Sequence, residues 1–262
     1  MRQQRLLAIA LFLALIAIAG CGKKEGESTQ APQPETQQAQ GIAVDAATVG
    51  SIAGKVSFTG EKPKLSRLMM DQDPVCSAKH SGPTFAEDGD VNSNGTLPNV
   101  FVYVKEGADK YSFPAPANAV ELDQDGCAYK PHVLGIQTNQ TLRILSKDAT
   151  THNIHPMPKE NREWNMSQAP GGAPIEQKFA RPEIMIPVKC NQHPWMRAYI
   201  GVTRNPLYAV TGKDGTFTIQ GIPPGDYTLE AWTATFGTQE LKVTLAPKES
   251  KSVDFTFKPA GS

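Results

Sequence analysis

Residues Val188 to Met196 read Val-Lys-Cys-Asn-Gln-His-Pro-Trp-Met, and the other strands are best understood from this segment. Apolar residues at every second position lead into it: Ile184, Ile186 and Val188. In a β-strand this spacing puts them on one face together with Cys190. The Cys190 thiol therefore ends an inward-facing apolar row. After a turn at His193, the apolar alternation of residues 198–202 predicts a second strand.

Three side chains in this stretch are metal ligands at regular spacing. Cys190, His193 and Met196 offer a thiol, an imidazole and a thioether three residues apart, so one short loop can wrap them around a single ion. A distant segment, Thr-His-Asn-Ile-His, contains His152. One Cys, two His and a weak Met are the ligand set of a type 1 copper site. The sequence therefore predicts one copper ion held by these four residues.

The ligand loop resembles that of the amicyanin- and plastocyanin-like cupredoxins. Residues Cys190 to Arg197 follow the pattern Cys-x-x-His-Pro-aromatic-Met-Arg, and His152–His155 is similar to the His-Asn-aliphatic-His of the same proteins. The likeness extends over residues 127–202. It implies a Greek-key sandwich that carries single electrons on one blue copper.

The same resemblance implies roles for the neighbours of the ligands. Asn153 would brace the two ligand loops by hydrogen bonds, as outer-shell groups do around metal sites. His193, followed by Pro194, would be the solvent-edge ligand through which electrons pass. Trp195, which replaces the phenylalanine usual in amicyanin, would pack over the site. His155 has no ligand role in that pattern.

Other interpretations of the same residues predict different chemistry. Cys190 as a buried free thiol and Met196 as core filler would leave no metal site. A structural zinc site is a second alternative, although zinc sites of one Cys, two His and one Met are unusual. A copper enzyme would need a second copper site with more histidines than the chain has: His80, His132, His152, His155 and His193. We therefore expect a protein that is not an enzyme.

The last quarter of the chain carries a separate pattern. Asp-Gly-Thr-Phe at 214–217 is followed by the corner Gly-Ile-Pro-Pro-Gly at 221–225 and an alternating aromatic strand at 226–232. This run resembles the carboxypeptidase regulatory-like, transthyretin-like family of β-sandwiches. Because that family is non-catalytic, the resemblance implies a scaffold.

The first strand of that family has its match far upstream, at Gly50–Val56. The sequence therefore favours a split sandwich, in which residues 50–60 and 98–105 pair with residues 207–258 and the copper domain is inserted between them. Insertion is tolerated where the ends of the inserted domain lie close together. Two consecutive domains are the alternative. Short alternating runs separated by Gly, Pro, Asn and Asp predict an all-β fold throughout.

The start of the chain is typical of an exported bacterial lipoprotein. Arg2 and Arg5 precede an apolar run, 6–18, that is too short for a membrane span. It ends in Ile-Ala-Gly-Cys, which resembles a lipobox and makes Cys21 the expected lipidation site. The residue after it, Gly22, favours the outer membrane over the inner. The polar, Pro- and Gln-rich residues that follow predict an unstructured tether.

Cys76 and Cys127 remain, and export would place them in an oxidising compartment. A Cys76–Cys127 disulfide is the simple hypothesis. The alternative is a second metal site that pairs Cys76 with His80 and Cys127 with His132.

These inferences define an organisation and three candidate functions. The expected parts are a signal peptide (1–20), lipidated Cys21 with its tether (21–48), N-terminal strands (49–105), a copper domain (106–206) and a regulatory-like domain (207–262). The favoured function is electron transfer with an unknown redox protein, such as a periplasmic dehydrogenase, cytochrome or reductase. Cu(I) storage or delivery and a metal-free structural surface protein are the alternatives. A formal net charge of zero argues against a nucleic-acid partner.

Overall fold

The computed structural model describes residues 41–259 of the chain. The predicted signal peptide, the lipidation site Cys21 and the tether up to residue 40 lie outside the described residues. Within 41–259, neither helical segment has the length or hydropathy of a membrane span.

The regular secondary structure of the described residues is almost entirely β-strand, as the sequence predicts. In chain order the elements are β1 (Ile42–Ala43), β2 (Gly50–Phe58), η1 (Met70–Gln72), α1 (Pro74–Ser77), β3 (Phe101–Glu106), β4 (Tyr111–Ser112), β5 (Val120–Gln124), β6 (Tyr129–Lys130), β7 (Val133–Gln137), β8 (Leu142–Ser146), β9 (His152–Pro156), β10 (Met166–Gln168), β11 (Ile175–Gln177), β12 (Glu183–Lys189), β13 (Arg197–Thr203), β14 (Tyr208–Val210), β15 (Thr216–Ile222), β16 (Gly225–Thr233), β17 (Gly237–Leu245), β18 (Ser250–Ser252) and β19 (Phe255–Phe257). The predicted all-β fold class is confirmed.

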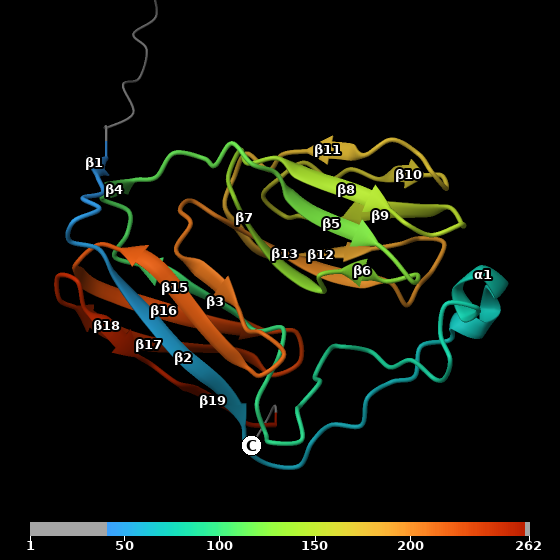
Figure 1. The fold of residues 1–262 in the computed structure, drawn as a ribbon, viewed down its shortest axis with the longest axis horizontal. Helices are drawn as coiled ribbons and strands as arrows, with labels where there is room; N and C mark the ends of the chain where they lie inside the picture. The colour runs from blue at the N-terminus through green and yellow to red at the C-terminus, as the bar shows by residue number, and fades with distance from the viewer. Residues whose placement is uncertain (1–40, 260–262) are drawn as a thin grey trace, which may run out of the picture. The chain divides into compact units, whose positions relative to one another are not determined.

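One sandwich combines strands from both ends of the described chain (Figure 1). Its first sheet has the order β14-β3-β16-β17, and its second has the order β15-β2-β18 with β19 also paired to β2. Strand β2 runs antiparallel to β15, and β3 runs antiparallel to β16. Strands β2 and β3 therefore belong to the same sandwich as β14–β19. Its core includes Ile52, Val102, Phe217 and Leu229, all buried.

A second sandwich holds the ligand loops. Its five-stranded sheet has the order β10-β9-β12-β13-β7, and its four-stranded sheet has the order β11-β8-β5-β6. The pairs β13–β7 and β5–β8 are parallel, which requires crossovers rather than hairpins. Leu122, Ile144, Ile186 and Ile200 fill its core, where Cys190 is also buried.

A bulge in β12 interrupts the alternation before the ligand loop, so the prediction that Ile184, Ile186 and Val188 share one face is wrong for Ile184. The register of β12 against β13 shifts between Glu183 and Ile186, and Met185 has a φ of 61°. An extra residue at such a bulge reverses the side-chain alternation on one side of it. Ile186 and Val188 therefore face the same core as Cys190, whereas Ile184 packs against a different cluster, with Phe101.

One predicted boundary, the end of the tether, is wrong. Residues 42–43 were expected in the tether, but they form β1, where the Ile42 backbone N–H donates to the Lys110 carbonyl at 2.8 Å. Their side chains are exposed and the pairing uses backbone atoms alone, so the amino-acid composition could not predict it. For residues 49–105 the sequence leaves open whether they join the copper domain or the split sandwich. Within this segment, residues 63–88, which we call the strap, lie against the second sandwich, because the strap residues Met70 and Cys76 are buried in its core.

Gly54 marks a close approach between β2 and the end of the chain. A Cβ at this position would lie 1.8 Å from the Val253 carbonyl oxygen. The Gly54→Ala variant is therefore expected to lower the free energy of unfolding by about 3 kcal/mol, because the backbone of a packed sheet must shift. Chemical denaturation of the variant and the wild type measures this difference in the free energy of unfolding. Gly82→Ala is the control, since no heavy atom lies within 4 Å of that Cβ, and equal stability of the two variants would contradict the close contact.

Candidate metal centre

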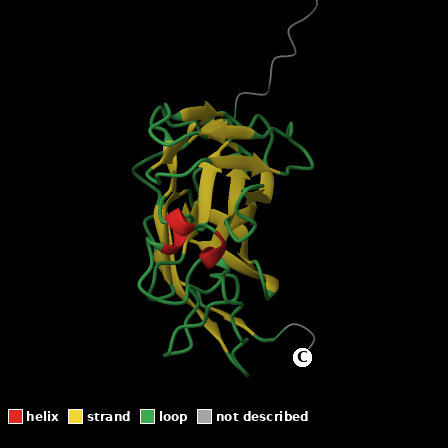
Figure 2. Ribbon diagram, turned by 90° about the vertical axis from the view of Figure 1, so that its right-hand side faces the viewer, coloured by secondary structure: helices red, strands yellow, loops and turns green. Residues whose placement is uncertain are grey.

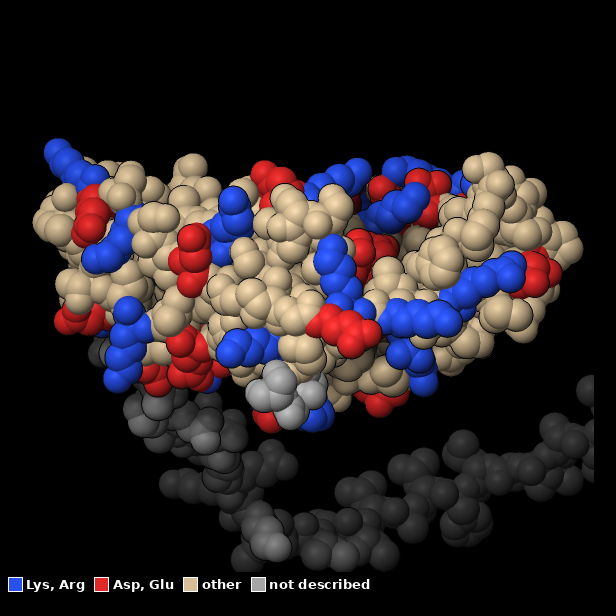
Figure 3. All heavy atoms as spheres, turned by 90° about the horizontal axis from the view of Figure 1, so that it is seen from below, with Lys and Arg blue, Asp and Glu red and all other residues tan. Residues whose placement is uncertain are grey.

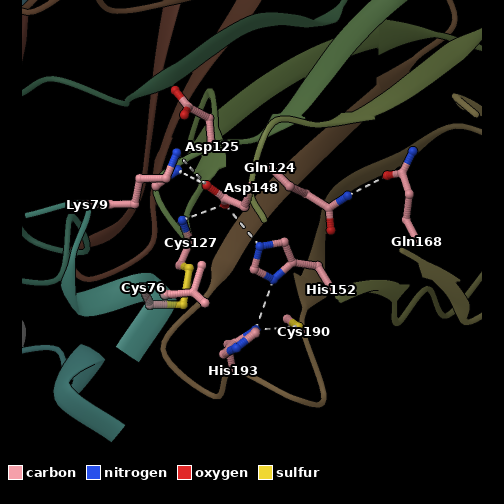
Figure 4. A network of polar contacts seen from close by, with 12 residues as sticks. Cys76, Lys79, Gln124, Asp125, Cys127, Asp148, His152, Gln168, Cys190 and His193 are labelled. Atoms are coloured by element: carbon pink, nitrogen blue, oxygen red, sulfur yellow. Dashed lines mark hydrogen bonds and ion pairs between the residues drawn. A yellow bond between two sulfur atoms is a disulfide. The ribbon is translucent and has the colours of Figure 1, made fainter. Parts of the chain in front are cut away.

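Three ligand atoms from two loops converge in the second sandwich (Figure 4). His152 opens β9, Cys190 follows β12, and His193 lies in the turn before β13. The Nδ1 atoms of His152 and His193 are 2.9 Å apart, and the Cys190 Sγ lies 3.7 Å from the His193 Nδ1. All three side chains are buried. The metal-binding atoms of three of the four predicted ligands therefore lie within 4.8 Å of one another.

The spacing of these atoms fits a trigonal N₂S site. Bond lengths of about 2.0 Å to nitrogen and 2.3 Å to sulfur would separate two ligand nitrogens by roughly 3.5 Å and a nitrogen from the sulfur by roughly 3.7 Å. The observed distance of 3.7 Å between the Cys190 Sγ and the His193 Nδ1 already equals this value. The Nδ1–Nδ1 distance of 2.9 Å is that of a hydrogen bond, so the rings would move apart by about half an ångström to admit an ion.

The outer nitrogen of each imidazole is held by a carboxylate that the sequence reading missed. The Nε2 of His152 lies 3.0 Å from the Asp148 Oδ2, and the Nε2 of His193 lies 3.1 Å from the Asp73 Oδ2. A carboxylate on the outer nitrogen fixes the ring orientation and leaves the other nitrogen free to bind a metal. Both rings are therefore oriented for binding through Nδ1.

Asp148 is itself held in place by the backbone. The Gly126 and Cys127 N–H groups donate to its two oxygens at 2.8 and 2.7 Å, and Lys79 lies 3.7 Å away. Burial acts to raise the pKa of Asp148, but the hydrogen bonds from Cys127, Gly126 and His152 outweigh it and hold that pKa below its ordinary value. Asp148 is an anion at neutral pH.

The electrostatic surroundings favour a neutral His152, which is the form that binds metals. Burial lowers the pKa of His152, and the hydrogen bond to Asp148 opposes that shift. The neighbouring His193 lowers the His152 pKa further. At Asp73, the hydrogen bond with His193 holds the carboxyl pKa below its ordinary value.

Asn153 connects the two ligand loops, in the position expected of it. The Asn191 N–H donates to the Asn153 Oδ1 at 2.8 Å, and the Cys190 thiol contacts the same oxygen at 3.4 Å. In return the Asn153 N–H points at the Cys190 Sγ at 3.5 Å. A third loop fixes the amide, because the Asn153 Nδ2 donates to the Asn165 side chain at 2.7 Å. The thiol and His152 are thus held in register.

The ligand loop closes on itself between β12 and β13. The Met196 N–H donates to the His193 carbonyl at 2.9 Å, and the Cys190 N–H donates to the Met196 carbonyl at 3.3 Å. The Met196 side chain is buried in the same core as Cys190. The Trp195 ring lies 5.1 Å from the His193 ring and donates its Nε1–H to the Cys127 carbonyl, while Pro194 is exposed.

The prediction that His193 lies at the solvent edge is wrong. Its side chain is only 5% exposed, because Asp73, at the N-cap of α1, covers its outer nitrogen. Figure 2 shows the two helical turns of the strap (red) in front of the strands. A disulfide between Cys76 and Cys127 ties α1 to the second sandwich. The strap therefore covers the edge that the resemblance left open.

The remaining histidines lie elsewhere. The disulfide uses both thiols of the alternative second metal site. His80 contacts the Gly126 carbonyl at 2.8 Å, and His132 contacts Asp88 at 2.8 Å. His155 interacts with Asn191 and Glu163. None of these three rings belongs to the cluster of His152, Cys190 and His193 within the described residues.

Comparison with known proteins identifies one domain by sequence. A family model for the carboxypeptidase regulatory-like domain matches residues 192–258, which contain β14–β19. The resemblance predicted for the last quarter of the chain is confirmed. No curated protein matches the chain.

Several solved structures are similar in fold to part of the chain. A mutant of amicyanin in the Cu(I) state is 17% identical, with a TM-score of 0.30, and the match covers 39% of this chain and 98% of amicyanin. A purple cupredoxin from Nitrosopumilus maritimus is 19% identical, with a TM-score of 0.28, over 32% of this chain and 99% of that one. A Cu-containing nitrite reductase from Thermus scotoductus SA-01 is 18% identical, with a TM-score of 0.30, over 38% of this chain. The chain spans 25% of the reductase's length.

Proposed function

We propose that this chain binds one copper ion through His152, Cys190 and His193, with Met196 as a weak fourth ligand, and that it carries single electrons. The observation that carries the proposal is the convergence of two Nδ1 atoms and one thiol sulfur in a buried site. A buried thiolate with two imidazoles is the donor set of blue-copper electron-transfer sites.

Bound copper would supply reversible one-electron chemistry, and the residues of the chain would keep its ligands in place. Asp148 and Asp73 hold the outer nitrogens of the two rings. Asn153 holds the thiol loop, and the surrounding core excludes water. Ligands held by these hydrogen bonds, in a site without water, would limit the structural change that accompanies electron transfer. We assign no catalytic residue.

We further propose that the protein is exported and anchored through a lipid on Cys21, at the outer membrane in preference to the inner. The disulfide supports this location, since disulfides persist in oxidising compartments. The partner would be another redox protein in the same compartment, such as a dehydrogenase, cytochrome or reductase. Positive and negative side chains are interspersed on the face drawn in Figure 3. This face therefore carries no basic patch of the kind that binds nucleic acid, and we propose no nucleic-acid partner.

One observation favours a second candidate, the storage or delivery of Cu(I). The strap covers the His193 edge, which is the edge that the electron-transfer hypothesis needs to be accessible. A closed, soft-ligand site suits a protein that keeps copper reduced.

Voltammetry of the copper-loaded chain distinguishes the two functions. Electron transfer predicts a reversible one-electron wave with one copper ion per chain. A colourless site that binds Cu(I) selectively and gives no reversible wave would support storage or delivery. No copper binding at all would leave the third hypothesis, a metal-free structural protein.

The Met196→Gln variant tests the fourth ligand. We expect it to retain copper and to have a lower reduction potential, because a harder oxygen ligand stabilises Cu(II) more than a thioether does. The Met166→Gln variant is the control, since Met166 is exposed on β10 and should leave the potential unchanged. A Met196→Gln potential equal to that of the wild type would remove Met196 from the ligand set.

A further inference from the structure

A pocket of about 720 Å³ opens between the strap and the ligand loop. Strap residues from Pro63 to Met70 and from Thr84 to Asp88 form one side, and residues Pro194 to Arg197 contribute to the other. Its volume lies within the range of about 300–1,000 Å³ that is usual for small-molecule sites. Met196, the proposed fourth copper ligand, is among the lining residues, but the copper proposal assigns no role to the open volume.

The strap presents an apolar surface to the pocket. Its two arms pair as a short ladder, in which the Leu68 N–H donates to the Thr84 carbonyl and Arg67 lies opposite Phe85. Met69 and Phe85 both line the pocket and are each 47% exposed. Large apolar side chains that are exposed together, rather than singly, mark interaction sites.

The pocket also has an excess of positive charge. Its lining contains four Lys or Arg residues and two acidic residues. Among the residues of 41–259, Lys64 and Arg67 are exposed and have no ion pair, whereas Lys130 pairs with Asp125.

The two acidic groups have other partners. Asp88 contacts His132 at 2.8 Å and accepts from the Tyr199 hydroxyl, and Glu87 accepts from the Asn99 amide. Glu87 stays exposed and charged, but the exposed Lys64, Arg67 and Arg197 outnumber it, so the pocket has a net positive charge.

We propose that this pocket binds a small organic anion. An apolar, aromatic body would contact Met69, Phe85 and Trp195, and an anionic group such as a carboxylate or sulfonate would meet Lys64 and Arg67. The concave shape favours a small molecule over a protein surface, since protein interfaces are larger and flatter. The ligand would bind beside the proposed copper site, because Met196 lines the pocket and the Trp195 ring lies 5.1 Å from the His193 ring.

Titration of the purified chain, without added metal, with anilinonaphthalene sulfonate tests the proposal. This fluorescent aromatic anion has a neutral counterpart, N-phenylnaphthylamine, with the same rings and no sulfonate. The chain has three tryptophans, Trp164, Trp195 and Trp232, of which only Trp195 lines the pocket. We expect saturable binding that shifts the indole N–H signal of Trp195 in a proton–nitrogen correlation spectrum and leaves the other two unchanged.

Charge variants identify the anionic subsite. Replacing both cations, Lys64→Gln with Arg67→Gln, should raise the Kd of the sulfonate on the order of tenfold. The same pair should leave the Kd of N-phenylnaphthylamine unchanged. The matched control is Arg162→Gln with Lys178→Gln, which removes two exposed cations outside the pocket and should leave both values unchanged.

Three results would overturn the proposal. They are no saturable binding, a shift of Trp164 or Trp232 in place of Trp195, and equal sulfonate affinity of the two charge variants. None of these readouts depends on copper, so a negative result here leaves the metal proposal intact.

Discussion

Replacing Asp148 with asparagine is expected to lower the free energy of unfolding by about 3 kcal/mol. The Asp148 side chain is fully buried, and its two oxygens accept from Gly126, Cys127 and His152. An amide has one acceptor oxygen and its NH₂ faces a donor, so at least one buried N–H loses its partner. The same change should weaken copper binding by about 10- to 100-fold, the usual effect of losing a carboxylate behind a metal-binding histidine.

The loss of stability in Asp148→Asn should depend on pH in one direction. Hydrogen bonding holds the pKa of Asp148 below its ordinary value of 3.8 in the folded state. A lowered carboxyl pKa stabilises the fold above pH 3.8, and this contribution is lost as the pH falls through the folded-state pKa. Urea denaturation should therefore show the gap between wild type and variant at pH 7 and a smaller gap in acid.

Asp125→Asn is the matched control for this prediction. Asp125 is a nearby aspartate that forms an exposed ion pair with Lys130, and such pairs contribute about 0–1 kcal/mol. If Asp148→Asn were as stable as Asp125→Asn at neutral pH, the buried network would not hold His152 in the way we describe.

Removal of the disulfide is expected to have a similarly large effect. Cys76 and Cys127 are 51 residues apart, and closing a loop of that length stabilises the folded state by about 4 kcal/mol on the chain-entropy estimate. The double variant Cys76→Ala with Cys127→Ala should be destabilised by about this amount. Its α1 would lose its link to the second sandwich, so Asp73 would no longer cover His193 reliably.

A reductant provides the control for the disulfide prediction. Dithiothreitol should destabilise the wild type and the Cys190→Ser variant alike, and it should leave the double variant unchanged. A double variant as stable as the oxidised wild type would show that the strap is held by its packing alone.

Sequence reasoning succeeded where the signal is local. Cys190 and His193 are three residues apart, so their spacing on one short loop is readable without any tertiary information. The alternation in β12 showed that Cys190 points inward, although the bulge at Met185 limited that pattern to Ile186 and Val188. A β-bulge is a single extra residue, so it leaves no repeating pattern of side chains from which it could be predicted.

The carboxylates behind the histidines could not be predicted, because their partners are far apart in the chain. Asp73 and His193 are separated by 120 residues and meet where the disulfide and the buried Met70 hold the strap against the second sandwich. In the sequence, Asp73 before Pro74 reads as ordinary turn punctuation. Asp148 lies close to His152, but four residues in a loop impose no geometry that would point one side chain at the other.

The position of the strap could not be predicted for a related reason. Residues 63–88 have little regular structure and no period, so the sequence offers no evidence of which sandwich they cover. Only Cys76, through its pairing with Cys127, carried that information. The pocket lined by the strap and the covered edge at His193 both depend on this long-range placement, which Met70 in the core and the Asp88–His132 contact also support.

The optical and electron paramagnetic resonance spectra of the purified chain loaded with Cu(II) would show whether the cluster is a type 1 copper site. A site made by His152, Cys190 and His193 predicts one copper ion per chain and an intense visible thiolate-to-copper charge-transfer band, which Cys190→Ser should remove while the far-UV circular dichroism stays unchanged. Copper bound without that band, or a band that survives in Cys190→Ser, would contradict the account.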